Sequence, residues 1–479
     1  METAVSAIAG DLISRLVSYL VKKCMDIPTI DEKLGRLQQL LLRIHAVIEE
    51  ADGRYITNSR MLLQLKLLVA SMYKGYHVLD TLRYRSLAEN LLHEESTSSS
   101  IPGKRSRMIP GSLRSFAESN DLQSVLENLE GAIANMAEFV VLLGGCERMC
   151  RRPHDTYLYI ENFMFGRHVE KQQIMNILLS DPGGHGAPTV LPVIGDCRVG
   201  KKTLVSHVSK NDRIQSYFSS IVFINGDSIG IMGNAKFSNE RTLVVVEFVT
   251  DVEDNEWVKF YSTIAHITAE GSKVIVISRI QSLARFGTVK AIALNSLSRE
   301  EYRYLFKMLA FGSADENDYP HLASVANELA ILFRGSLVTA NVIADSLRRN
   351  LDIKVWLSVF HRYKGMVDCN LSKYGDHPKN IIDNERSIDT STMCSSYPAS
   401  RYLMPPRVER DDCPKRSLPH ISFGDLMTNN GGIGIPNDEF VVVGWESRLP
   451  PYTRFVNDVE RAVEKQGSTI SARKRRSSI

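Results

Sequence analysis

Five short apolar runs restrict what the middle of this chain can fold into. They are VLPVIG at 190–195, IVFIN at 221–225, LVVVEF at 243–248, KVIVIS at 273–278 and AIAL at 291–294. Near-continuous Val and Ile are typical of strands that are buried on both faces, as in a parallel sheet covered by helices. We therefore predict an α/β domain with a parallel sheet over residues 158–296.

The first 145 residues carry a different pattern, in which apolar residues recur at spacings of three and four. Two of the stripes consist of Val5, Ile8, Leu12, Leu16 and Leu20, and of Leu34, Leu37, Leu41, Ile44 and Ile48. Further helical segments follow at 60–87 and 122–140. Each stripe is the apolar face of an amphipathic helix and has to be buried. The pattern predicts an all-α four-helix bundle over residues 1–145.

The rest of the chain divides by composition. Residues 297–360 have helical patterns, which predict a smaller helical subdomain. Residues 361–419 are polar and rich in Asp, Asn, Ser and Pro, which predicts a disordered linker. Residues 420–479 regain apolar segments (ISFGDLM, EFVVVGW and LPPYTRFV) and form a short region of uncertain fold with a basic tail, SARKRRSSI. The tail is either a nuclear-import signal or a solvated charged terminus.

Charge and cysteine content exclude several classes of protein. Lys and Arg total 58 against 55 Asp and Glu, so we expect no nucleic-acid-binding surface along the chain. Seven scattered cysteines, an odd number, indicate reduced thiols and a cytoplasmic or nuclear location. The chain contains no uninterrupted apolar run of about 18 residues, so no membrane-spanning helix is expected.

The segment VLPVIGDCRVGKKTLVSHV combines a strand, the spacing Gly-x-x-x-x-Gly-Lys and a helix. Its glycines permit a tight turn whose N–H groups, with the helix N-terminus, form an anion cradle. Lys201 is placed to reach terminal phosphates, but Lys202 stands where a P-loop has the Ser or Thr that binds Mg²⁺. Thr203 lies about 100° further round the helix. The candidate nucleotide-binding residues of this segment are Gly195, Val199, Gly200, Lys201, Lys202 and Thr203. The alternative is a glycine-containing turn with a chance lysine.

Two other strand ends carry candidate residues. Glu247 ends an apolar run, as does the acidic residue that holds Mg²⁺ in a Walker B strand. The next position, where hydrolytic proteins often have a second acidic residue, is Phe248, and Asp251 lies further on. Arg279 follows the run KVIVIS, at the sheet edge where nucleotides bind, and is placed to contact a γ-phosphate. Glu247 and Arg279 are otherwise ordinary charged residues at strand ends.

In this order, after a helical bundle, the segments resemble those of plant intracellular immune receptors with an N-terminal coiled-coil domain and an NB-ARC nucleotide-binding module. The resemblance covers residues 1–365 and rests on YIENFMFGRHVEKQQIMNILL, GDCRVGKKT, LVVVEFVTD, GSKVIVISR, ALNSLSREEYRYLF and FRGSLVTANVIA. It implies that Phe165, Gly166 and Arg167 lie near the adenine, and that 297–360 is the helical ARC-type subdomain.

The N-terminal helices resemble the Rx-type four-helix domain of these receptors. The Glu-Asp-Val-Ile-Asp motif of that domain is present only as the sequence YHVLD at 76–80. Lys202 and Phe248 depart from the usual pattern, and Ser336 and Leu337 replace the Leu-Pro that touches the adenine. No Met-His-Asp motif and no leucine-rich repeats are found. The resemblance therefore implies a truncated, degenerate member that binds ADP or ATP without hydrolysing it, and a resident Mg²⁺ is not expected.

The resemblance implies a nucleotide-dependent switch or regulator of the defence response. Its expected partners are a nucleotide, other immune receptors or signalling proteins bound through the helical bundle, and possible further copies of itself. Membrane association is expected only after assembly. Two alternatives remain: a helical interaction adaptor or decoy that pairs with full-length receptors and binds no nucleotide, and a working ATPase, against which Lys202 and Phe248 argue.

Overall fold

The computed structural model describes residues 29–96, 111–149, 165–180, 187–226, 240–393, 401–409, 420–428, 440–446 and 454–461. The chain forms two compact units. The first comprises Met1–Ser180 with Ser298–Tyr304, and the second comprises Asp181–Leu297 with Leu305–Ile479. None of the helices in the described ranges combines the length and apolarity that a bilayer span requires.

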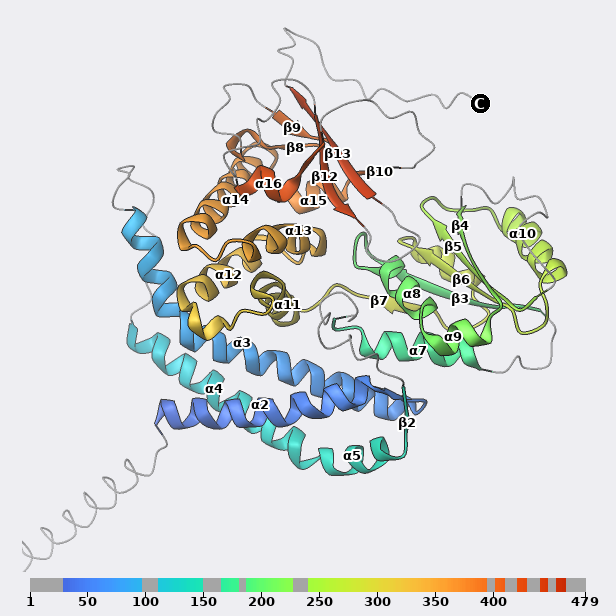
Figure 1. The fold of residues 1–479 in the computed structure, drawn as a ribbon, viewed down its shortest axis with the longest axis horizontal. Helices are drawn as coiled ribbons and strands as arrows, with labels where there is room; N and C mark the ends of the chain where they lie inside the picture. The colour runs from blue at the N-terminus through green and yellow to red at the C-terminus, as the bar shows by residue number, and fades with distance from the viewer. Residues whose placement is uncertain are drawn as a thin grey trace, which may run out of the picture. The chain divides into compact units, whose positions relative to one another are not determined.

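The first unit is helical, as predicted. Its long helices are α2 (Ile30–Asp52), α3 (Ser59–Ser96), α4 (Gly111–Ala134) and α5 (Met136–Gly144), and α2, α3 and α4 lie side by side (Figure 1). A capping box starts α2, because the side chains of Thr29 and Glu32 bond each other's backbone N–H. The predicted positions Leu37, Leu41, Ile44 and Ile48 are all in the core. The predicted first helix, at 5–20, lies outside the described residues.

Helix α7 (His168–Leu179) also belongs to the first unit. The amide of Gln172 donates to Arg54 O at 2.8 Å and accepts from Ile56 N–H at 3.3 Å. The amide of Asn176 donates to Ile56 O at 3.0 Å. These bonds satisfy backbone groups next to β1 (Arg54–Tyr55), the short strand that pairs with β2 (Glu147–Arg148). The domain start predicted at residue 158 therefore does not coincide with the division between the units after residue 180.

The second unit contains the predicted parallel sheet, and each of the five apolar runs forms one of its strands. The strands are β3 (Thr189–Gly195), β4 (Ser220–Asn225), β5 (Thr242–Phe248), β6 (Lys273–Ser278) and β7 (Ile292–Leu294), in the order β4-β5-β6-β3-β7. All four pairings are parallel. Helices α8 (Lys201–Ser209), α9 (Asp212–Tyr217) and α10 (Asp254–Ile267) accompany the sheet. Strand β3 lies between β6 and β7, so its carboxyl end is flanked on both sides.

A helical part follows, as predicted. Its helices are α11 (Arg299–Phe311), whose first residues belong to the first unit, α12 (Pro320–Leu332), α13 (Leu337–Arg348), α14 (Ile353–Tyr374) and α15 (Pro378–Asp383). Ser336 begins α13, since its hydroxyl accepts from Thr339 N–H.

The disordered linker predicted over 361–419 is wrong wherever that range is described. Helix α14 continues to Tyr374, and β8 (Ile388–Asp389), β9 (Arg401–Leu403) and β10 (Arg407–Glu409) follow α15. The segment folds because α14 has a buried apolar face, although polar residues stand between its apolar ones in the sequence. This face includes Phe360, Tyr363, Met366 and Val367. Residues 394–400 and 410–419 of the predicted linker lie outside the described residues.

The three apolar segments after residue 420 also form regular structure. They give β11 (His420–Ser422), α16 (Phe423–Thr428), β12 (Phe440–Glu446) and β13 (Arg454–Arg461). With β8, β9 and β10 these strands make a second, mixed sheet in the order β11-β12-β13-β9-β8, with β10 also paired to β13. The basic tail lies outside the described residues.

Candidate functional site

The loop between β3 and α8 has the geometry that its glycines predict. A Cβ at Gly195 would collide with the carbonyl oxygen of Leu294 on β7. Gly200 has φ +91°, in the left-handed region, and is the residue from which α8 begins. Arg198 also has a left-handed φ of 57°, and Val199 beside it is buried. The chain therefore turns sharply off the end of β3 and directs the first N–H groups of α8 back toward the strand end.

Lys201 folds back over this loop. Its Nζ donates to the carbonyl oxygens of Gly195 at 2.9 Å and Asp196 at 2.6 Å. Burial is the main cause that lowers the pKa of the Lys201 amine. The amine thus lies over the mouth of the turn, the place that a P-loop lysine needs in order to reach a phosphate.

Lys202 lies beside β5, the strand that was predicted to act as a Walker B strand. Its Nζ is 2.9 Å from Oε2 of Glu247, near the end of β5, and both side chains are partly exposed. A P-loop has a Mg²⁺-binding hydroxyl at the position of Lys202, and Glu247 was predicted to bind the same ion. In this structure the ammonium group of Lys202 joins the two positions directly. Thr203, one residue further along α8, is half-buried. The donor set does not fit Mg²⁺, which needs several oxygen ligands in octahedral geometry.

The two positions after Glu247 that were considered as a base are Phe248 and Asp251, and neither is a free base. Phe248 is buried in the core of the sheet, with its ring centroid 6.2 Å from that of Trp257. Asp251 accepts from Arg285 at 3.3 Å and from the hydroxyl of Ser282 at 3.1 Å. Its pKa is lowered chiefly by the backbone N–H of Val252, so the carboxylate is held ionised and engaged. The position that activates water in hydrolytic P-loop proteins is therefore filled by a core aromatic ring.

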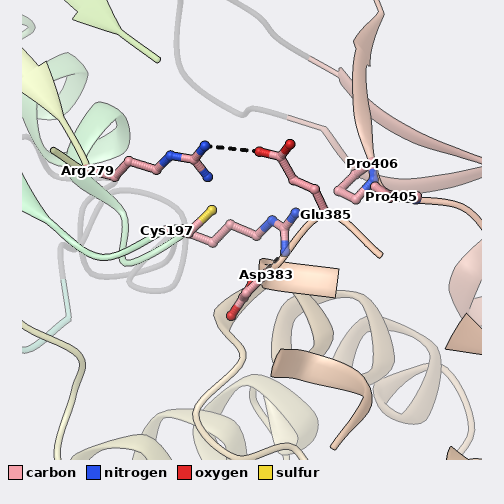
Figure 2. A pocket seen from close by; sticks show the side chains of 7 residues that line it. Cys197, Arg279, Asp383, Glu385, Pro405 and Pro406 are labelled. Carbon is pink, nitrogen blue, oxygen red and sulfur yellow. Dashed lines mark hydrogen bonds and ion pairs between the residues drawn. The ribbon is translucent and has the colours of Figure 1, made fainter. Parts of the chain in front are cut away.

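Arg279 follows β6 directly and is paired with a carboxylate that sequence analysis did not predict. Its Nη2 lies 3.0 Å from Oε1 of Glu385, and Nη1 of Arg198 lies 2.5 Å from Oδ1 of Asp383. Figure 2 shows Arg279 and Glu385 pointing toward each other. A cavity of about 620 Å³ lies here, and its lining comprises Cys197, Arg198, Arg279, Asp383, Glu385, Pro405 and Pro406.

Asp383 and Glu385 were missed because they lie in the segment predicted as a linker, and no motif marks them. Glu385 has φ 58°, in the left-handed region, and is the second residue after α15. The signal that finds this region is indirect, namely the apolar stripe of α14, which shows that the chain after residue 361 is folded.

Phe165, Gly166 and Arg167 lie in the first unit, whereas Gly195–Thr203 lie in the second. The ring of Phe165 is 5.1 Å from that of Tyr73 and 6.0 Å from that of Tyr304, measured between centroids. Gly166 has φ 68°, and Arg167 precedes α7 and is buried, which lowers the pKa of its guanidinium. Contact of these residues with adenine stays a prediction.

Comparisons with known proteins find a family match within the first unit and relatives that cover more of the chain. The Rx N-terminal domain family matches residues 8–109. Disease resistance protein RGA2 of Solanum bulbocastanum is 23% identical over 72% of this chain and 37% of its own length. RPP13-like protein 1 of Arabidopsis thaliana, also a disease resistance protein by name, is 29% identical over 46% of this chain and 21% of its own length.

The chain therefore spans little more than a third of the length of RGA2. Among solved structures, domain III of the Thermotoga maritima replication initiation protein DnaA covers 49% of this chain and 97% of that chain, at 13% identity and a TM-score of 0.26, which is too low to support an argument. From the family match and the sequence relatives, this chain has an Rx N-terminal domain and is homologous to plant disease resistance proteins over about 72% of its length.

Proposed function

We propose that this chain binds ADP or ATP at the loop between β3 and α8 and acts in the cytoplasm as a nucleotide-dependent switch or regulator of plant defence. The observation that carries the proposal is the position of Lys201, whose amine is held over the turn by Gly195 O and Asp196 O. These two bonds hold the amine at the turn, where it can donate to a phosphate oxygen.

The surroundings of the loop support an anionic ligand. The N–H groups at the start of α8 and the helix dipole favour phosphate oxygens at this point. Arg198 and Arg279 add two guanidinium groups on the wall of the adjoining cavity, which is large enough for part of a nucleotide. A β-phosphate over the turn would displace the carbonyl oxygens from Lys201 and take their place.

A switch requires an element whose position depends on the ligand. The ion pairs Arg198–Asp383 and Arg279–Glu385 join the carboxyl end of the parallel sheet to the last residue of α15 and to the segment that follows it. Because the Arg279–Glu385 pair is partly exposed, it contributes roughly 0–1 kcal/mol, and a phosphate group can compete for the arginine. In the proposed mechanism, a γ-phosphate takes Arg279 from Glu385 and weakens the join, whereas a diphosphate leaves it in place.

The switch acts without hydrolysis. Phe248 cannot accept a proton and is fixed in the core, and Asp251 is held by Arg285. A cycle would then be reset by nucleotide exchange and not by cleavage of the γ-phosphate.

The test is the nucleotide that accompanies the purified full-length chain, identified by mass spectrometry. We expect ADP or ATP with the wild-type chain and a loss of most of it in Lys201→Ala. Lys210→Ala, at the exposed C-terminal end of the same helix, is the matched control and should keep its nucleotide. Equal nucleotide content in all three proteins, or none in any, contradicts the proposal.

A second candidate is the helical adaptor that pairs with full-length immune receptors and binds no nucleotide. Exposed apolar side chains on the first unit favour it, since Leu42, Leu67 and Val141 are 72%, 62% and 76% exposed. The two candidates differ in one result. Receptor capture by the adaptor is the same for wild type and Lys201→Ala, whereas capture by the switch depends on the bound nucleotide.

A further inference from the structure

The Lys202–Glu247 ion pair indicates how the loop differs from other P-loops, on the condition that the proposed function holds and the loop binds a nucleotide. We propose that the ammonium group of Lys202 takes the place of Mg²⁺, so that the loop binds a nucleoside diphosphate without a divalent cation and prefers it to the triphosphate.

The geometry is the first argument. In a P-loop, the residue after the conserved lysine offers a hydroxyl to Mg²⁺, and the Walker B carboxylate holds the same ion. Here those two positions are joined directly, with Lys202 Nζ 2.9 Å from Glu247 Oε2. A lysine side chain is long enough to reach the carboxylate from the first turn of α8 with no ion between them. Its ammonium therefore occupies the region between the helix and the strand in which the ion is held.

The charge balance is the second argument. The Lys202 ammonium already neutralises the Glu247 carboxylate, and Lys201 adds a second amine at the loop. A divalent cation placed there would meet two like charges and only one carboxylate, and it would have no hydroxyl ligand at position 202. Mg²⁺ has to displace Lys202 before it can bind, whereas a phosphate oxygen can accept from the three-donor ammonium directly.

The preference for a diphosphate follows from the amount of positive charge that Lys202 supplies in comparison with Mg²⁺. Mg²⁺ bridges the β- and γ-oxygens of a triphosphate and neutralises two charges there. A lysine that is already paired with Glu247 supplies less positive charge at that point. The γ-phosphate is therefore left less well neutralised than in a metal-dependent site, and ADP should bind more tightly than ATP.

The experiment is an equilibrium titration of the full-length chain, first stripped of bound nucleotide, with ADP and with ATP, in one buffer with MgCl₂ and in one with EDTA. For the wild-type chain we expect the same affinity in both buffers. Lys202→Thr restores a hydroxyl and frees Glu247, so its ADP affinity should become about tenfold higher with MgCl₂ than with EDTA. Lys210→Thr, the same substitution at the other end of α8, should behave like the wild type.

The outcomes separate the inference from the function on which it depends. If ADP binds the wild-type chain about tenfold more tightly with MgCl₂, or ATP with MgCl₂ binds more tightly than ADP, the lysine does not replace the metal and only the inference fails. If the wild-type chain binds no ADP in either buffer, the proposed function fails as well. The two-buffer comparison on the wild-type chain stands whether or not Lys202→Thr folds.

Discussion

Arg279 donates from Nη2 to Oε1 of Glu385 at 3.0 Å, although the two residues are 106 positions apart in the chain. The arginine predicted to contact a phosphate is thus already bonded to a carboxylate from the segment after α15. This pair connects the carboxyl end of the parallel sheet to the C-terminal part of the same unit. Under the proposed function, a nucleotide has to break this pair before its phosphate can bind the arginine.

Glu385→Gln should raise the affinity for ATP, because it releases Arg279 from its carboxylate partner. A partly exposed pair is worth at most about 1 kcal/mol, so we expect a rise of up to about fivefold. The measurement is titration with ATP. Glu446→Gln is the control, since Glu446 pairs with Arg454 at the same 3.0 Å and with similar exposure, in the second sheet. An unchanged or lower ATP affinity in Glu385→Gln would show that the pair does not compete with phosphate.

The parallel sheet could be predicted from the sequence because its strands are short runs rich in Val, Ile and Leu, which are typical of strands buried on both faces. Helix α14 could not be predicted in this way, because Tyr363 and Met366 stand among Lys, Gly, Asp and Asn. The polar composition of the segment indicated a linker and concealed the helical spacing of its apolar residues. The glycines and Lys201 were placed correctly at the turn by spacing alone. The bond of Lys202 to Glu247 depends on how α8 lies against β5, which spacing does not specify.

Asn370 provides a test of the folded structure after residue 361, where the polar composition had predicted a linker. Its side chain is fully buried, donates to Asp389 O at 2.7 Å and accepts from Asp389 N–H at 2.9 Å. Asn370→Ala leaves both backbone groups without a partner and should lower the free energy of unfolding by about 2 kcal/mol. Urea unfolding of the full chain measures it.

Asn255→Ala is the control for that experiment, because Asn255 is exposed on α10 and its loss should change stability by less than about 0.5 kcal/mol. Equal stability of the two variants would mean that the strand after α15 does not depend on α14.

The surroundings of His377 predict that the free energy of unfolding falls at mildly acidic pH. Its Nδ1 accepts from Lys379 N–H at 3.1 Å, so the ring proton is on Nε2, which donates to Leu332 O at 2.9 Å. Burial is the main cause that lowers the pKa of His377 below its ordinary value of 6.5. The hydrogen bond to Leu332 O and the charge of Asp376 act against it, whereas Arg334 and Lys379 act in the same direction as burial. The folded chain therefore binds this proton at lower pH than the unfolded chain does.

The contribution of His377 to stability is complete above pH 6.5 and is lost as the pH falls toward the lowered pKa of the folded state. His377→Gln should remove that part of the pH dependence, so the gap between the urea midpoints of wild type and variant should narrow from about pH 7.5 to about pH 5.5. His266→Gln, at an exposed position on α10, is the control. A constant gap across this range would show that His377 does not contribute.

The aromatic cluster around Phe165 gives a fourth test. Its ring packs on Tyr73 and Tyr304 within the first unit. Phe165→Ala should therefore lower the stability of that unit, by about 2 kcal/mol for a ring that is only partly buried. Thermal unfolding followed by tyrosine fluorescence measures it, with Phe165→Leu expected to recover part of the loss. Unchanged stability in Phe165→Ala would mean that the ring is held for another reason, such as contact with a nucleotide.

The central claim is that the turn between Gly195 and Gly200, with Lys201 over it, binds the phosphates of a nucleotide. Calorimetric titration with ADP of the full-length chain, first stripped of bound nucleotide, tests it most directly, because it needs no assay of defence. The account predicts saturable binding to one site, weakened about tenfold or more in Lys201→Ala and unchanged in Lys210→Ala. No heat of binding with the wild-type chain, or equal affinity in Lys201→Ala, would contradict it.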